Sequence, residues 1–261
     1  MCPRSARHVS WLAAETPQVG RFRSLGGNTI VECSIEGIGR NPAALRDVST
    51  KSGINVVMGT GFYLARVHPA DMAKRTVEDL TALFVSEIQE GVAIDEEHGG
   101  GRVRAGLIGE LGCTTDLQPT ELKVLKAAAA AQAITGASIS IHPGYSALAP
   151  NNILDVLAKA GADLSRVIMG HVDRGLLKLD HMLLLAARGC TLEFDQFGWG
   201  ESFVHALAYD ITYPSDFERV KMIKALIDAG YGKQVQSGLW VVYARCVASH
   251  FRFSRPDRDQ S

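Results

Sequence analysis

Short, continuously apolar runs alternate along the chain with longer amphipathic segments that end at glycine. Six of the apolar runs are rich in β-branched residues and predict buried strands. They cover Thr29–Ile35, Ile54–Met58, Ala105–Glu110, Ser138–His142, Arg166–His171 and Cys190–Asp195. Continuous rather than alternating apolar character is typical of parallel strands that are covered on both faces. We therefore expect a parallel sheet that is flanked by helices.

The segments between these runs have the composition and the end signals of helices. They cover Pro42–Ser52, Pro69–Glu90, Pro119–Thr135, Pro150–Ala160, Leu176–Arg188 and Asp216–Ala229. Each is followed by glycine, which readily takes the positive φ found at helix C-termini, and four begin at or near proline, which suits a first helical turn. Strand and helix thus alternate, as in repeated βα units with right-handed crossovers.

Repeated βα units close into a (β/α)8 barrel or form an open doubly wound sheet. The glycine fingerprint of a dinucleotide-binding sheet is missing, because neither Gly37-Ile38-Gly39 nor Gly59-Thr60-Gly61 is followed by the third glycine at the required spacing. No GxxxxGK[ST] phosphate loop occurs. Gly99-Gly100-Gly101 follows an acidic stretch, so we interpret it as a flexible loop rather than a phosphate cradle.

Three potential metal ligands end three successive predicted strands. Glu110 ends RAGLIGE, His142 ends ASISIH and His171 ends RVIMGH. One helix and its loops separate each strand from the next, so the topology presents all three side chains at the same edge of the sheet. A carboxylate and two imidazoles that converge can bind a divalent metal ion. The pattern therefore favours a barrel with a metal at its mouth.

Length and charge restrict the partners. The chain has 261 residues, of which 46% are hydrophobic and 21% charged, which suits one domain of barrel size. A formal net charge of -1 gives no electrostatic reason to expect nucleic acid or an anionic membrane as partner. We expect a small-molecule substrate, with neither nucleic acid nor membrane as partner. The pattern specifies no oligomeric state.

Cysteine usage and the apolar runs indicate a cytoplasmic location. The five cysteines are far apart, odd in number and without a CxxC pair, so neither a disulfide framework nor a cysteine zinc site is predicted. No apolar run approaches the ~18 residues of a membrane span, and the first twenty residues lack the apolar core of a signal peptide.

Six motifs along the chain carry a family resemblance. They are GGNTIVECSIEGIGRN, GINVVMGTGFY, GLIGELG, IHPG, GHVDR and LEFDQFG. Their order and spacing, from about Arg21 to Val235, resemble the phosphotriesterase-related proteins of the amidohydrolase superfamily. The resemblance implies a (β/α)8 TIM barrel, a binuclear centre that usually holds zinc, and hydrolysis by a metal-bound hydroxide. Members of the animal branch cleave N-acetyltaurine and related N-acyl amino acids, whereas other branches act on lactones or organophosphate triesters, so the resemblance to this branch implies amide substrates.

The resemblance also implies roles for individual residues. Glu110 matches the carboxylate that bridges the two metals, in place of the carbamylated lysine of other branches. His142 and His171 match the two imidazoles of the second metal. For Asp173 and Asp195 no ligand role is matched, and support of the ligands or a structural role is expected.

The chain departs from the family pattern at both ends. The family has a His-x-His pair on the first strand and an Asp on the eighth, and these three bind the first metal. Here His8 is followed by Val9 and Ser10, and Asp228 precedes the last expected strand. We therefore expect an incomplete barrel, with the first strand absent and the eighth altered, and at most one of the family's two zinc ions. The family's eighth-strand Asp is also the proton acceptor, so no catalytic residue is assigned.

Two functional hypotheses follow from this comparison. The first is a zinc-dependent hydrolase of N-acyl amino acids with impaired activity, and the second is a catalytically silent relative with a structural role or none. The expected organisation is an irregular segment over 1–20, a hydrolase barrel over 21–235 and a tail outside the family pattern over 236–261. Leu239–Ala244 could form a strand, and the tail beyond Ser254 is expected to pack weakly.

Overall fold

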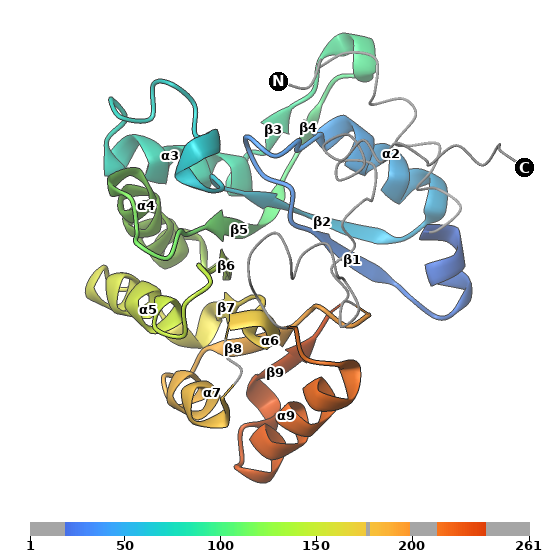
Figure 1. The fold of residues 1–261 in the computed structure, drawn as a ribbon. Coiled ribbons are helices and arrows are strands. Elements are labelled where there is room, and N and C mark those ends of the chain that lie inside the picture. The colour runs from blue at the N-terminus through green and yellow to red at the C-terminus, as the bar shows by residue number, and fades with distance from the viewer. Residues whose placement is uncertain (1–18, 176–177, 199–212, 239–261) are drawn as a thin grey trace, which may run out of the picture.

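A curled sheet, with seven parallel strands among the described residues, organises the protein (Figure 1). The computed structural model describes residues 19–175, 178–198 and 213–238. The strands lie in the order β1-β2-β5-β6-β7-β8-β9, and every neighbouring pair is parallel. They are β1 (Thr29–Glu32), β2 (Asn55–Thr60), β5 (Ala105–Gly112), β6 (Ile139–His142), β7 (Val167–Met169), β8 (Thr191–Phe194) and β9 (Val235–Ser237).

Helices cover the convex side of this sheet (Figure 1). They are α2 (Pro42–Ser52), α3 (Val77–Gln89), α4 (Pro119–Thr135), α5 (Ala149–Lys159), α7 (Leu179–Ala186) and α9 (Asp216–Asp228). Short 3-10 turns occur at Ala65–Val67 (η1), Glu96–His98 (η2), Leu164–Arg166 (η3) and Gly232–Gln234 (η4). The result is an open half-barrel that resembles an incomplete (β/α)8 barrel, which confirms the expected parallel α/β fold. Within the described residues β1 and β9 are the two edges and do not pair with each other.

The core lies between the sheet and these helices. Leu80 and Phe84 of α3 and Ala127, Ala128 and Ala131 of α4 are fully buried. The small alanine side chains let α4 lie close to its neighbours, and the apolar strand residues fill the other side of the layer. Among the described helices, none is both long and apolar enough to span a membrane.

The sequence predicted six strands, but the parallel sheet has a seventh among the described residues, β9. Its sequence, Val235-Gln236-Ser237, is short and polar, and it lacks the continuous apolar character used to recognise the other strands. It lies at the edge of the sheet, where Val235 is half-buried and the next two residues are exposed. A polar strand is tolerated there because only one flank is covered by a neighbouring strand.

Two segments between the strands of the parallel sheet also differ from the prediction. The helix expected over Pro69–Glu90 begins only at Val77, because Thr76 caps it and forms a reciprocal pair of hydrogen bonds with Asp79. The segment with Gly99-Gly100-Gly101 joins the antiparallel strands β3 (Val92–Ala93) and β4 (Arg102–Val103), so it lies within a short hairpin. All three glycines have positive φ.

Several sequence predictions fall outside the described residues. They concern the segment 1–18, the possible strand over 239–244 and the tail from 239 onward. The helix predicted over Leu176–Arg188 begins at Leu179 in the described part, after a separate short helix α6 (Val172–Gly175) that the sequence pattern did not indicate.

Candidate metal centre

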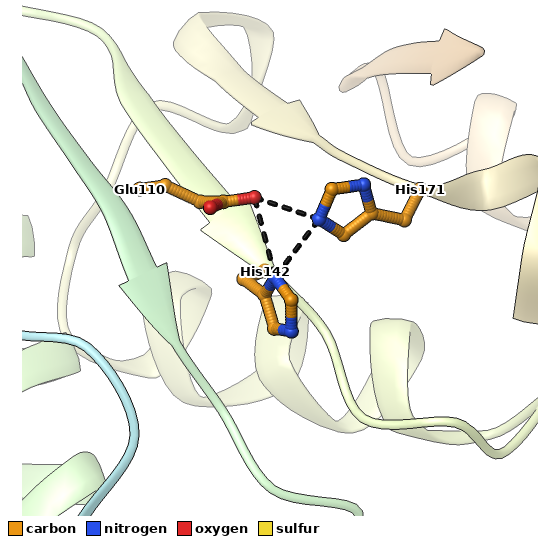
Figure 2. Close-up of side chains that lie close together, drawn as sticks. All are labelled: Glu110, His142 and His171. Carbon is orange, nitrogen blue, oxygen red and sulfur yellow. Dashed lines mark hydrogen bonds and ion pairs between the residues drawn. The ribbon is translucent and has the colours of Figure 1, made fainter. Parts of the chain in front are cut away.

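Glu110, His142 and His171 meet at the carboxyl ends of three neighbouring strands. Glu110 lies near the end of β5, and His142 is the last residue of β6. His171 lies just after β7, from which only Gly170 separates it. Because β5, β6 and β7 are adjacent and parallel, their ends lie at one edge of the sheet. Figure 2 shows the three side chains pointing toward one another.

The contacts within this group are short. Glu110 Oε1 lies 2.7 Å from His171 Nε2 and 3.3 Å from His142 Nδ1, and the two imidazole nitrogens are 2.8 Å apart. All three ligand atoms lie within 4.8 Å of one another, and the three residues are buried. One carboxylate oxygen and two imidazole nitrogens thus face one point.

Glycine makes the convergence possible. A Cβ on Gly109 would come within 2.3 Å of the Ser140 carbonyl oxygen, and one on Gly170 within 2.9 Å of the Ile141 oxygen. The strands can therefore approach only where a side chain is missing. His171 itself has φ 54°, in the left-handed region, which typically costs about 1–3 kcal/mol in a non-glycine residue. Contacts of both its ring nitrogens hold it in that conformation.

The three pKa values show how charge is distributed in this group. Burial raises the pKa of Glu110, but His171 and His142 outweigh that effect and hold it below its usual value. Burial lowers the pKa of His142 to about 4. Burial also lowers the pKa of His171, yet Glu110 and Asp195 outweigh it and raise it to about 9. Two carboxylates thus favour the charged form of the His171 imidazole.

Asp195 supports His171 from the side opposite to Glu110. Its Oδ2 lies 2.7 Å from His171 Nδ1, so the imidazole is placed between two carboxylates. A carboxylate on the second nitrogen is the usual way in which proteins orient a metal-binding histidine. Asp173, in contrast, forms a fully buried ion pair with Arg219 of α9, at 2.8 Å. Asp195 thus contacts one of the three candidate ligands, whereas Asp173 contacts a residue of a helix.

Tyr63 and Arg174 surround His142 and were not identified from the sequence. The Tyr63 hydroxyl lies 3.0 Å from Nε2 and 3.1 Å from Nδ1 of His142. Arg174 Nη2 lies 3.1 Å from the same Nε2. Tyr63 lies in the loop after β2, and no local pattern distinguishes it from a core aromatic residue.

Glu193 is a third residue that sequence reasoning missed. A Cβ on Gly170 would lie 3.6 Å from Glu193 Oε2 and 3.8 Å from Glu110 Oε1, so both carboxylates border the same space. Burial, with Asp195 nearby, raises the pKa of Glu193 to about 7. Its position two residues before Asp195 was a usable signal, because alternate residues of a strand share a face.

Comparisons with the sequences of known proteins identify a family. The sequence profile of the Phosphotriesterase family matches residues 5–239. A phosphotriesterase-related protein of Nematostella vectensis is 41% identical over 219 residues, which cover 84% of this chain and 60% of the relative. An N-acetyltaurine hydrolase of Dictyostelium discoideum is 42% identical over 214 residues, covering 82% of this chain and 56% of the relative. The chain thus spans less than two thirds of the length of these relatives.

Solved structures of other proteins have a similar fold. A phosphotriesterase homology protein from Escherichia coli, crystallised with phosphate in its active site, superposes with a TM-score of 0.77 at 31% identity, over 92% of this chain and 77% of its own. A resiniferatoxin-binding protein from Rhodobacter sphaeroides superposes with a TM-score of 0.79 at 34% identity, over 87% of this chain and 61% of its own. The curled sheet, the Glu-His-His group and these matches together show that the chain belongs to the Phosphotriesterase family.

Proposed function

We propose that the chain is a zinc-dependent hydrolase that cleaves the amide bond of N-acetyltaurine and related N-acyl amino acids. The observation that carries this proposal is the buried convergence of Glu110, His142 and His171. The relatives named N-acetyltaurine hydrolase supply the substrate class. The proposed hydrolase unit covers residues 21–235.

The donor set suits zinc. Imidazole nitrogen and carboxylate oxygen are ligands that zinc accepts, and three protein ligands leave a coordination position open. Zinc bound there would polarise the substrate carbonyl and lower the pKa of a bound water molecule. The chain's own residues would hold the zinc ion and orient its ligands. Glu110 supplies the negative charge, Asp195 fixes the ring of His171, and the Tyr63 hydroxyl faces His142.

We propose at most one zinc ion and an activity below that of relatives with a complete set of ligands. None of the eight histidines forms a His-x-His pair, and Val235–Ser237, the last described strand, contains no Asp. The second ligand set and the proton acceptor that the family resemblance implies are therefore missing from these positions. Loss of a general base alone typically lowers the rate by ~10²- to 10⁴-fold. The same observation favours the second candidate function, a silent relative with a structural role.

We also propose a cytoplasmic protein that acts on small molecules. The described cysteines Cys33, Cys113 and Cys190 are free thiols, which suits a reducing compartment.

The test combines metal content with turnover. The full chain is freed of metal with a chelator, incubated with zinc, and dialysed before elemental analysis. We expect up to one zinc per chain, lost in Glu110→Gln and His142→Asn and retained in the control His98→Asn, whose side chain is exposed. Taurine release from N-acetyltaurine is then measured by mass spectrometry, and slow turnover that a chelator abolishes is expected.

The outcomes separate the two candidate functions. Zinc binding with chelator-sensitive turnover supports the hydrolase. Zinc binding without turnover favours the silent relative. No zinc binding, or two equivalents, contradicts the proposed site.

A further inference from the structure

Arg174 is a buried cation that has no anionic partner among the residues that the structure describes. Its side chain belongs to a residue that is only 4% exposed, yet it forms no ion pair with any Asp or Glu of the described residues. All its partners are neutral or weakly basic: the Tyr145 hydroxyl at 3.2 Å, the Pro143 carbonyl at 2.9 Å and His142 Nε2 at 3.1 Å. Nε of the guanidinium has no hydrogen-bond partner among the described residues.

Two other arginine side chains that are buried in the described part of the chain are neutralised. Arg219 forms ion pairs with Asp173 and Asp216, and Arg40 forms a bidentate ion pair with Glu87. Burial of a charge without a partner costs several kcal/mol, so buried arginines are normally paired. The contrast within one chain indicates that the partner of Arg174 is a ligand.

The position of Arg174 places that ligand beside the candidate metal centre. Arg174 lies in α6, three residues after His171, and contacts His142 on the Nε2 side. Glu110 and His171 contact the same ring on the Nδ1 side. If Nδ1 binds a metal, Nε2 of the neutral ring keeps its hydrogen and cannot accept one from Arg174. An N–H of the guanidinium then needs another acceptor.

Tyr145 lies between this guanidinium and solvent. Its ring stacks on Arg174 with 4.2 Å from the guanidinium carbon to the ring centroid, and the residue is 38% exposed. Tyr145, Arg174 and His142 thus form a sequence of contacts that leads from the surface to the metal ligands.

We propose that Arg174 binds the anionic end group of the substrate, a sulfonate or a carboxylate, and so makes the site selective for acyl amides with a negatively charged amine portion. This inference rests on the proposed function. A guanidinium presents planar N–H donors that match such oxygens in pairs, and hydrogen bonds between charged groups are about twice as strong as neutral ones.

The test compares two ligands that differ in charge. N-acetyltaurine and its neutral sulfone isostere, N-(2-methylsulfonylethyl)acetamide, are titrated separately into the full chain with zinc, and binding is measured by calorimetry. We expect the sulfonate to bind at least about 10-fold more tightly, as a charge-assisted hydrogen bond implies. Arg174→Gln should remove that preference, and Arg174→Lys should keep part of it.

Controls separate charge recognition from folding. Arg188→Gln removes a surface arginine that pairs with Asp155 and should leave the preference unchanged. Thermal unfolding monitors the fold of each variant. If Arg174→Gln does not fold, the wild-type comparison of sulfonate with sulfone and the Arg174→Lys variant decide the matter.

The possible failures are distinguishable. Equal binding and equal hydrolysis of the sulfonate and the sulfone would overturn the role of Arg174 and leave the hydrolase in place. A preference that survives in folded Arg174→Gln would overturn it as well. If neither amide binds nor is hydrolysed, both proposals fail.

Discussion

Nδ1 of His171 lies 2.7 Å from Oδ2 of Asp195, and the two residues come from adjacent strand ends. This contact leaves Nε2 as the nitrogen that faces Glu110. Asp195 therefore decides both the orientation of the ring and which nitrogen is presented to a metal.

Asp195→Asn should weaken zinc binding. The amide keeps the size of the side chain but loses the charge that supports the imidazole, so we expect zinc affinity to fall by about 10- to 100-fold. Competition with a chromophoric chelator measures the change. Asp155→Asn, which alters a surface carboxylate on α5, serves as the control. Unchanged affinity in Asp195→Asn would show that the contact does not support a ligand.

Asp173→Asn should destabilise the fold strongly. Asp173 and Arg219 are both fully buried, and loss of one charge leaves the other without its main partner. Breaking such a pair typically costs about 3–5 kcal/mol. Urea unfolding at neutral pH measures the free energy of unfolding. The control, Lys224→Ala, breaks the exposed pair with Asp228 on α9 and should cost below about 0.5 kcal/mol. A loss as small as the control's would contradict the importance of the buried pair.

Glu121→Gln should loosen two loops at the mouth of the half-barrel. The buried Glu121 carboxylate accepts hydrogen bonds from the backbone N–H of Ala65, Thr114 and Gln118, each at 3.0 Å. An amide has one acceptor oxygen, so at least one buried donor loses its partner, at about 1–3 kcal/mol. Chemical unfolding checks this, with Glu78→Gln on the exposed side of α3 as the control. Equal stability of the two variants would count against the prediction.

Gly112→Ala should lower the melting temperature. A Cβ at this position would lie 2.3 Å from the Leu64 nitrogen and 2.5 Å from the Tyr63 carbonyl carbon, which are backbone atoms that cannot rotate away. Overpacking of this kind costs about 1–3 kcal/mol, and each kcal/mol corresponds to about 2–4 °C in a domain of this size. Differential scanning calorimetry measures the shift. Gly20→Ala is the matched control, because nothing lies within 4 Å of its Cβ position. A normal melting temperature for Gly112→Ala would mean that the loop after β2 adjusts freely.

The sequence alone determined the alternation of strands and helices and the meeting of Glu110, His142 and His171. Parallel strands that are buried on both faces are typically continuous apolar runs, and helices often end next to glycine, so both leave local signals. The ends of successive parallel strands share one edge, and this topology was enough to predict that the three side chains approach one another.

Only the tertiary structure decided which groups surround them. Tyr63 and His142 are 79 positions apart, and Asp173 and Arg219 are 46 apart, so no local pattern links either pair. The polar strand β9 is likewise visible only once it lies against β8. Whether Arg174 forms an ion pair within the described part of the chain depends on every neighbour that folding brings to it or keeps away. Local patterns follow from backbone periodicity, whereas the charge balance of a buried side chain is a property of the whole packed neighbourhood.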